Sequence, residues 1–280
     1  MVRLSVFADE AGDSLKEQID ALVENGLAET DVRGINGKNV LAFEEAEAKA
    51  YGEELAAAGI SVACIGSPLG KRDVCDYAEF EKDLDKILKT AEIFKTDRIR
   101  IFSFYHSEGK RAQVMDCLGQ AVLHAKKYGV TLYHENEHAV YGERAAECKD
   151  LLDTVGCGCV FDPANFVLIG QDITEAEKLL LPYSDFYHVK DGRYTGDIVP
   201  AGYGDANVRE LLKRDGVLLT IEPHLFEFGG LAGLTEKDLT RGEFVYKTQR
   251  EAFDAGVTAV KNILTDNGFV KDAHGRWNKK

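Results

Sequence analysis

The stretch Gly129-Val-Thr-Leu-Tyr-His-Glu-Asn-Glu-His138 joins a short apolar run to a dense group of ionisable side chains. Branched and aromatic residues in its first half are typical of a β-strand, and Gly129 is a stop signal for the helical pattern before it. The carboxylates and imidazoles follow where this strand is expected to end. The sequence therefore predicts a strand over Val130–Glu135 that carries a polar site at its C-terminal end.

Short apolar runs of this kind alternate with longer helical patterns along the whole chain. The expected strands are Arg3–Ala8, Ala28–Arg33, Ile60–Ile65, Arg98–Phe102, Val130–Glu135, Gly158–Asp162, Asp185–Val189 and Val217–Glu222. The expected helices are Ser14–Glu24, Phe43–Ala58, Tyr77–Phe94, Arg111–Tyr128, Gly142–Thr154, Ile173–Leu180, Ala206–Lys213 and Phe244–Leu264. Eight alternating strand–helix units predict an α/β protein with one closed (β/α)₈ TIM barrel.

A doubly wound open sheet has the same local pattern, but the turn after the first strand disfavours it. The segment Phe7-Ala-Asp-Glu-Ala-Gly-Asp13 is acidic, whereas a dinucleotide site needs a glycine-rich loop with exposed amides. No linker rich in Pro, Gly or Ser divides the chain. We therefore expect one barrel domain over residues 1–265, followed by a polar C-terminal tail over residues 266–280.

The net charge of the chain disfavours some classes of binding partner. It has 34 basic and 48 acidic side chains in 280 residues, a formal net charge of −14. Such a field repels nucleic acid and anionic membranes, and no apolar run reaches the roughly 18 residues of a membrane helix. The N-terminus has no signal-peptide pattern, and six cysteines are scattered without a disulfide framework. We expect a cytoplasmic protein with a small-molecule partner, and homo-oligomerisation stays open.

Four of the expected strands end in a carboxylate or a histidine. These residues are Glu135, Asp162, His188 and Glu222. Because residues two apart on a strand share a face, each of the four can point into the barrel mouth at its C-terminal face. Alternation leaves one ambiguity, because Glu137 shares the phase of Glu135 and is a rival ligand.

Two glutamates, one aspartate and one histidine form a site for one hard divalent cation. Mn²⁺ is favoured, and Mg²⁺, Co²⁺ and Zn²⁺ are alternatives. An ion that holds adjacent carbonyl and hydroxyl oxygens lowers the cost of an enediolate, and a nearby carboxylate can move the proton. Proton transfer on two faces by Glu135 and Glu222 gives epimerisation, and transfer on one face gives isomerisation.

Polar residues just beyond the strand ends are candidates for substrate binding. They are Asn165, Lys190, Asp191, Arg193 and His224. Glu10, Tyr105 and His106 have weaker support as lining residues of the same mouth. Glycine amides in the last two loops, at Gly202, Gly204, Gly229 and Gly230, are equally suited to phosphate binding and to hinge motion.

Other ionisable residues on the strands are expected to be structural. His134 has the opposite phase from Glu135, which favours a hydrogen-bonded histidine outside the site. Some of the charged residues on earlier strands, among Asp31, Arg33, Arg98 and Arg100, are expected to pair inside the barrel rather than to act in catalysis. The Cys157-Gly-Cys159 pair is expected to be ordinary packing.

Several motifs together resemble the xylose-isomerase-like TIM barrel superfamily, in its branch of sugar phosphate isomerases/epimerases. They are Phe7-Ala-Asp-Glu10, Arg33-Gly-Ile-Asn-Gly-Lys-Asn39, Ile65-Gly-Ser-Pro68, His134-Glu-Asn-Glu137, Phe161-Asp-Pro-Ala-Asn165, His188-Val-Lys-Asp191 and Ile221-Glu-Pro-His224. The resemblance implies that Glu135, Asp162, His188 and Glu222 bind the metal and that the two glutamates carry protons. Asn165 departs from the pattern, because several similar epimerases have a histidine there.

The resemblance implies a metal-dependent isomerase or epimerase of a sugar, polyol or sugar phosphate. The superfamily also contains lyases, so an inosose dehydratase or the catalytic subunit of a C-glycoside deglycosidase is the alternative. Only the last would have a small β-rich partner subunit. A sugar-binding barrel without turnover is a third hypothesis. Endonuclease IV-like enzymes hold three zinc ions with many more histidines, and seven histidines with a charge of −14 argue against that function.

Overall fold

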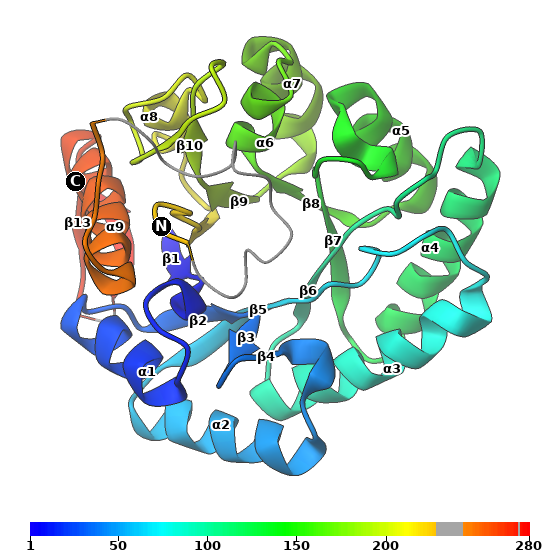
Figure 1. The fold of residues 1–280 in the computed structure, drawn as a ribbon, viewed down its shortest axis with the longest axis horizontal. Helices are drawn as coiled ribbons and strands as arrows, with labels where there is room; N and C mark the ends of the chain where they lie inside the picture. The colour runs from blue at the N-terminus through cyan, green and yellow to red at the C-terminus, as the bar shows by residue number, and fades with distance from the viewer. Residues whose placement is uncertain (228–242, 274) are drawn as a thin grey trace.

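Eight parallel strands surround a central axis in the computed structural model, which describes residues 1–227, 243–273 and 275–280 (Figure 1). The strands are β1 (Arg3–Val6), β2 (Glu29–Val32), β5 (Ser61–Gly66), β6 (Arg98–Ile101), β7 (Thr131–Glu135), β8 (Gly158–Phe161), β9 (Phe186–Val189) and β12 (Leu218–Ile221). Their order is β1-β12-β9-β8-β7-β6-β5-β2. An isolated parallel bridge between Phe7 and Asp31 then joins the two ends of the sheet. The predicted (β/α)₈ TIM barrel is confirmed.

Helices form the outer ring of the barrel (Figure 1). They are α1 (Leu15–Glu24), α2 (Glu45–Ala57), α3 (Tyr77–Phe94), α4 (Arg111–Lys126), α5 (Ala145–Val155), α6 (Pro163–Leu168), α7 (Ile173–Leu180), α8 (Val208–Leu211) and α9 (Gln249–Asp266). Every expected helix has a counterpart, but α6 was not predicted. A helix of 6 residues that begins with proline is too short to show a helical period.

Short elements occupy the loops between the main strands and helices. The 3-10 helices are η1 (Ala8–Glu10), η2 (Val40–Ala42), η3 (Tyr141–Glu143) and η4 (Leu181–Tyr183). Two small antiparallel pairs lie beside them: β3 (Gly34–Ile35) with β4 (Lys38–Asn39), and β10 (Asp191–Gly192) with β11 (Ile198–Val199). Both pairs follow a barrel strand directly, so they extend the loops at the C-terminal face.

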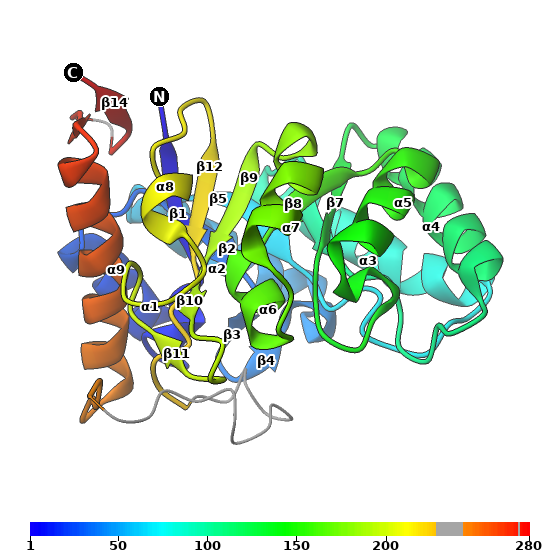
Figure 2. The same ribbon diagram turned by 90° about the horizontal axis from the view of Figure 1, so that it is seen from above.

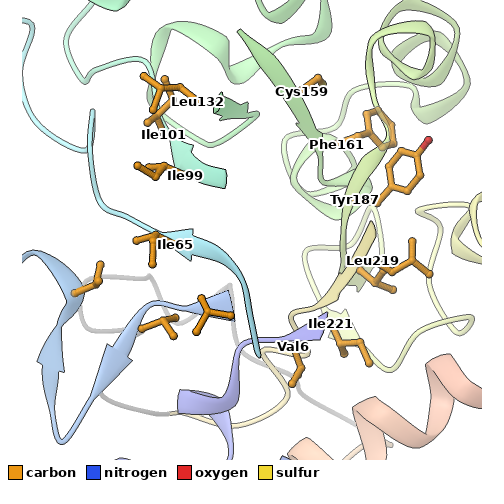
Figure 3. Packing of buried hydrophobic residues seen from close by; sticks show 14 of the residues in the cluster. Val6, Ile65, Ile99, Ile101, Leu132, Cys159, Phe161, Tyr187, Leu219 and Ile221 are labelled. Carbon is orange, nitrogen blue, oxygen red and sulfur yellow. The ribbon is translucent and has the colours of Figure 1, made fainter. Parts of the chain in front are cut away.

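Apolar residues of the strands divide between two layers, as the alternation predicts. One phase of each strand, including Leu132, Phe161, Tyr187 and Leu219, packs in the large cluster between strands and helices (Figure 3). The opposite phase fills the barrel interior, where a small cluster comprises Ala63, Cys64, Val160, Phe186 and Leu218 with Tyr133 packed against it. This small apolar cluster fills the barrel interior below the C-terminal ends of the strands. The polar residues therefore gather above it, at the mouth of the barrel.

The last residues of the chain are ordered against the barrel. Strands β13 (Phe269–Lys271) and β14 (Trp277–Lys279) form a hairpin, and Trp277 pairs with Val2 beside the start of β1. Figure 2 shows both termini at this end of the molecule. The composition of this segment predicts a polar tail, but Phe269 and Trp277 are buried. Four apolar residues among many polar ones give no recognisable period, so only the tertiary contact shows the role of Phe269 and Trp277.

Among the described helices, none combines the length and the apolar character needed to cross a lipid bilayer.

Candidate metal centre

The four predicted strand-end residues meet at the mouth of the barrel. Glu135 ends β7, Asp162 follows β8, His188 lies in β9, and Glu222 follows β12. Their exposed fractions are 2%, 0%, 0% and 4% in the same order. One potential ligand atom from each lies within 4.8 Å of the others. Parallel neighbours bring their C-terminal ends to one edge, which explains why residues far apart in sequence converge.

His188 lies at the centre of this group. Its Nδ1 is 2.8 Å from Glu135 Oε1 and 3.4 Å from Glu222 Oε2. Asp162 Oδ2 and Glu222 Oε2 are buried, and the nitrogen atoms beside them are Lys190 Nζ at 3.1 Å and His188 Nδ1 at 3.4 Å. Three carboxylates buried together are costly unless enough positive charge compensates them. Three carboxylates and one imidazole are a suitable donor set for a hard divalent ion, so this buried cluster indicates a divalent metal site.

Asp162 has a second role at the start of α6. Its Oδ1 accepts hydrogen bonds from the amides of Ala164 at 2.9 Å and Asn165 at 3.2 Å, which caps the helix. Asn136 exchanges two further hydrogen bonds with the Asp162 backbone. Pro163 at the first helical position is compatible with this turn because it needs no amide donor. Capping holds one oxygen and leaves Oδ2 directed to the cluster.

Each carboxylate of the cluster also contacts a basic side chain. Arg100 Nη1 donates to Glu135 Oε2 at 2.7 Å, and Arg33 Nη1 donates to Glu222 Oε1 at 2.8 Å. Lys190 Nζ lies 3.1 Å from Asp162 Oδ2. The two arginines bind the glutamate oxygens that do not face His188. The glutamates are therefore held in orientation by cations behind them.

These contacts shift the acidity of the cluster. Burial lowers the pKa of His188, but the charges and hydrogen bonds of Glu135 and Glu222 outweigh it and raise this pKa to about 10. Burial opposes ionisation of Glu135, yet His188 and Arg100 hold its pKa below the usual range. The pKa of Asp162 is raised by burial, with Lys190 opposing. The cluster thus stabilises positive charge at its centre, where a proton on His188 and a divalent cation are alternatives.

Phe7 contacts both Arg33 and the histidine of the cluster. The Arg33 guanidinium lies 4.4 Å from the centre of the Phe7 ring, and the ring meets His188 edge-on at 5.1 Å. Arg100 lies 4.3 Å from the ring of Phe102. Aromatic faces attract cations, so these rings fix the arginines in place. Structural pairing inside the barrel was the expectation for Arg33 and Arg100; the structure brings both to the metal cluster.

Two of the five predicted substrate residues lie beside the cluster. Lys190 contacts Asp162, and His224 Nε2 is 3.1 Å from Glu222 Oε1. Asn165 is directed to the backbone of Asn136, where its side-chain amide donates at 2.8 Å. This hydrogen bond connects the start of α6 to the residue that follows β7.

The side chains of Asp191 and Arg193 bind partners outside the cluster. Both carboxylate oxygens of Asp191 accept backbone amides, those of Gly192, Gly202, Gly204 and Ala206. Arg193 pairs with Glu243 at 2.7 Å on the surface. Phosphate binding and hinge motion were equal alternatives for Gly202 and Gly204, and in this structure their amides donate to Asp191. Gly229 and Gly230 lie outside the described residues.

The structure shows which of the remaining ionisable residues belong to the cluster, a question that strand alternation left open. Glu137 is not in the cluster; it follows the end of β7 and pairs with Lys71 at 2.7 Å. His134 lies outside the cluster and its Nε2 is 2.9 Å from Ser103 Oγ, as expected for a structural histidine. His106 is exposed and pairs with Asp73. Glu10 lies next to Glu222 and His224 in a second group of potential ligands.

Comparisons with known proteins agree with this fold. A sequence profile described as "Xylose isomerase-like TIM barrel" matches residues 20–224. No curated protein sequence shows significant similarity to the chain. L-ribulose 3-epimerase has a similar structure, with a TM-score of 0.71, 12% identity, and coverage of 95% of this chain and 96% of that one.

Two further solved structures have the same architecture. The probable 3-DHS dehydratase AsbF from Bacillus anthracis has a TM-score of 0.69 at 15% identity, covering 93% of this chain and 99% of its own. A xylose isomerase-like TIM barrel protein from Mycobacterium smegmatis, in complex with magnesium, has a TM-score of 0.66 at 14% identity, covering 95% and 97%. At such identities the similarity shows a shared fold and leaves the reaction open.

Proposed function

This chain belongs to the xylose isomerase-like TIM barrel family, and on that premise we propose that it is a divalent-metal-dependent isomerase or epimerase of a sugar, polyol or sugar phosphate. The observation that carries the proposal is the convergence of Glu135, Asp162, His188 and Glu222 within 4.8 Å in a buried site. Mn²⁺ is the ion that we assign to it, because the donors are mostly carboxylates with one imidazole.

The two glutamates are the proton carriers of the proposed reaction. A bound ion would supply Lewis acidity to adjacent carbonyl and hydroxyl oxygens, which makes the neighbouring C–H bond more acidic. Glu135 and Glu222 come from β7 and from the end of β12, on either side of the histidine strand β9. One carboxylate removes the proton and the other returns it on the opposite face of the carbon, which inverts the centre. Return by the same carboxylate to the adjacent carbon, with a proton passing from the hydroxyl oxygen to the former carbonyl oxygen, interchanges the two groups and gives an isomer instead.

The electrostatics of the site prepare both glutamates for this role. His188 and Arg100 lower the pKa of Glu135, and Lys190 and His224 lower that of Glu222, in each case against the effect of burial. Both carboxylates are therefore ionised, the form in which a base must begin. Arg33 and Arg100 hold one oxygen of each, so the carboxylates need little reorientation before reaction.

The substrate is proposed to bind beside Lys190 and His224. Both side chains are buried next to cluster carboxylates and carry hydrogen-bond donors. Sugar hydroxyls and phosphate oxygens accept such donors. Asn165 and Asp191 are proposed to act only by holding the loops that present these two residues.

Solvent proton exchange tests the proposal directly. The Mn²⁺-loaded protein is incubated in D₂O with a panel of ketoses, ketose phosphates and keto-inositols, and deuterium at the carbon next to the carbonyl is followed by NMR. We expect exchange with at least one substrate, accompanied by an epimer or isomer. Exchange should disappear on chelation of the metal and in Glu135→Gln and Glu222→Gln. Absence of exchange and of products across the panel would count against the function.

Metal-assisted elimination is the second candidate. The observation that favours it is Lys190, a buried ammonium 3.1 Å from Asp162 Oδ2 that could serve as the acid for a leaving hydroxyl. An elimination needs one base and one such acid, and it forms a carbon–carbon double bond conjugated with the carbonyl. New ultraviolet absorbance with loss of water would favour a dehydratase, and cleavage of a C-glycoside would favour a deglycosidase that has a β-rich partner subunit.

A further inference from the structure

A second group of potential metal ligands adjoins the first. It comprises Glu10 of η1, Glu222 and His224, all buried, with ligand atoms within 4.8 Å of one another. Glu222 belongs to both groups. Its Oε2 faces His188, whereas its Oε1 faces His224 at 3.1 Å. The carboxylate therefore has the geometry of a bridge between two cation positions.

The guanidinium of Arg33 occupies the second position. Nη1 donates to Glu222 Oε1 at 2.8 Å, and Nη2 lies 3.2 Å from Glu10 Oε1. A bidentate contact with Asp9, at 2.9 and 3.0 Å, fixes the plane of the group. The Phe7 ring lies 4.4 Å away. A planar cation with this many partners is pre-organised, so it holds its place at little entropic cost.

We propose that the Arg33 guanidinium takes the place of a second divalent cation, so that the centre binds one exchangeable ion. The inference rests on the proposed metal centre, because it concerns the ion that shares Glu222. Loss of the arginine would leave the carboxylates of Asp9, Glu10 and Glu222 buried without compensation. A divalent cation coordinated by Glu10, Glu222 and His224 restores the balance, and these oxygen and nitrogen donors suit Mn²⁺.

This arrangement gives the protein a fixed positive charge that cannot exchange with solvent. Arg33 keeps Glu222 Oε1 engaged, so only Oε2 is left for the ion of the first group. The number of bound ions then depends on a side chain and not on the metal concentration. Arg33 acts here as a positioning residue that sets the nuclearity of the centre.

Metal stoichiometry of the full-length protein tests the proposal. Wild type, Arg33→Ala and Arg33→Lys are dialysed against MnCl₂, and bound Mn²⁺ is measured by elemental analysis and by low-temperature EPR. We expect one ion in wild type and in Arg33→Lys, and two in Arg33→Ala with the spectrum of a spin-coupled pair. The double variant Arg33→Ala/Glu10→Gln should return to one ion, because it lacks a ligand of the second position.

Each contrary result has a distinct meaning. One ion in folded Arg33→Ala, with one in wild type, overturns the inference and leaves the proposed function intact. Two ions in wild type also overturn it. No ion in wild type removes both the inference and the metal premise of the proposed function. Arg33→Gln, which keeps donors towards Asp9, is a second variant with the same expectation of two ions, and circular dichroism checks its folding.

Discussion

Arg100 and Glu135 form an ion pair that is almost entirely buried. Arg100 Nη1 lies 2.7 Å from Glu135 Oε2, and their side chains are 6% and 2% exposed. The other oxygen of Glu135 lies 2.8 Å from His188 Nδ1. One carboxylate thus connects an arginine on β6 to the centre of the metal cluster. The orientation of a potential ligand is set by a strand that supplies no ligand itself.

Arg100→Met is expected to lower the free energy of unfolding of the metal-free protein by about 3–5 kcal/mol, because it leaves the Glu135 carboxylate buried and unpaired. Urea denaturation measures the loss. Arg111→Met is the matched control, because Arg111 pairs with Asp150 at an exposed position and its loss should cost about 1 kcal/mol or less. Saturating Mn²⁺ should reduce the Arg100→Met deficit. Equal effects of the two variants would contradict a structural role for the buried pair.

Mn²⁺ should raise the melting temperature. An ion that binds only the native protein at one hundred times its Kd adds about 2.7 kcal/mol, which corresponds to a shift of roughly 5 °C for a chain of this size. Differential scanning fluorimetry with and without EDTA measures it. Asp162→Ala should abolish the shift, because it removes a ligand of the cluster. A full shift in that variant would place the ion elsewhere.

Glu135→Gln and Glu222→Gln should each lower kcat by roughly 10²–10⁴-fold, since an amide cannot carry a proton. Steady-state kinetics on the substrate identified by exchange gives the values. Glu137→Gln provides the control from the same motif, because Glu137 pairs with Lys71 outside the cluster. Its activity should stay within a few-fold of wild type. A large loss in the control with none in Glu135→Gln would reverse the roles of the two residues.

Asp31 makes stability depend on pH. Burial raises its pKa from 3.8 to about 6, although hydroxyls of Ser5 and Thr220 donate to it. The native state therefore holds this proton where the unfolded state has lost it, so stability falls as pH rises from about 4 to above 6. The cost above that range is on the order of 3 kcal/mol. Asp31→Asn should accordingly be more stable than wild type at pH 7.5, with little difference below pH 4.

Asp150 provides a control, because its pKa is lowered in the folded protein whereas that of Asp31 is raised. Hydrogen bonds from Arg111 and Tyr141 lower its pKa to about 2. Its stabilising contribution is present above the unfolded pKa of 3.8 and disappears as pH falls through about 2. Asp150→Asn should therefore lose stability at neutral pH. Denaturation curves of Asp31→Asn and Asp150→Asn at several pH values measure the change in unfolding free energy. Changes of the same sign in both variants at neutral pH would contradict these two predictions.

Gly204→Ala should unfold the loop after β10 and β11 before the barrel itself. A Cβ at this position would lie 2.2 Å from Asp191 Oδ1 and 2.5 Å from the carbonyl oxygen of Gly192. The four amides held by Asp191 would then be released. Hydrogen–deuterium exchange should increase over residues 200–206, while Gly119→Ala, in helix α4 with open space around it, should leave those residues protected. Unchanged exchange in Gly204→Ala would show that the loop does not depend on Asp191.

Local pattern was sufficient for the eight strands and for the residues at their ends. An apolar run with period two fixes which side chains face the axis, and parallel strands bring their ends to one edge. Strand period and chain direction were therefore enough to predict that Glu135, Asp162, His188 and Glu222 converge at one end of the barrel. The same rule could not distinguish Glu137 from Glu135, because the two residues share one phase. The structure distinguishes them because β7 ends at Glu135.

Contacts between strands far apart in sequence could not be predicted from a pattern. Arg33 and Arg100 looked like structural charges because their partners, Glu222 and Glu135, lie 189 and 35 residues away. Asp191 had the residue type of a substrate ligand, but four amides of the following loop take both its oxygens. Trp277 lies in a polar segment of the sequence, and only its antiparallel bridge with Val2 shows that it packs against the barrel.

The amino-acid sequence alone determined the barrel, the face that carries the site, and the four side chains that converge there, because these depend on period and chain direction. Tertiary structure decided which oxygen of each carboxylate faces His188 and which cation holds the other oxygen. It also placed Arg33 between Glu10 and Glu222. Closure of the barrel brings β2 beside β1, and only that closure sets the distances on which charge compensation in a buried site depends.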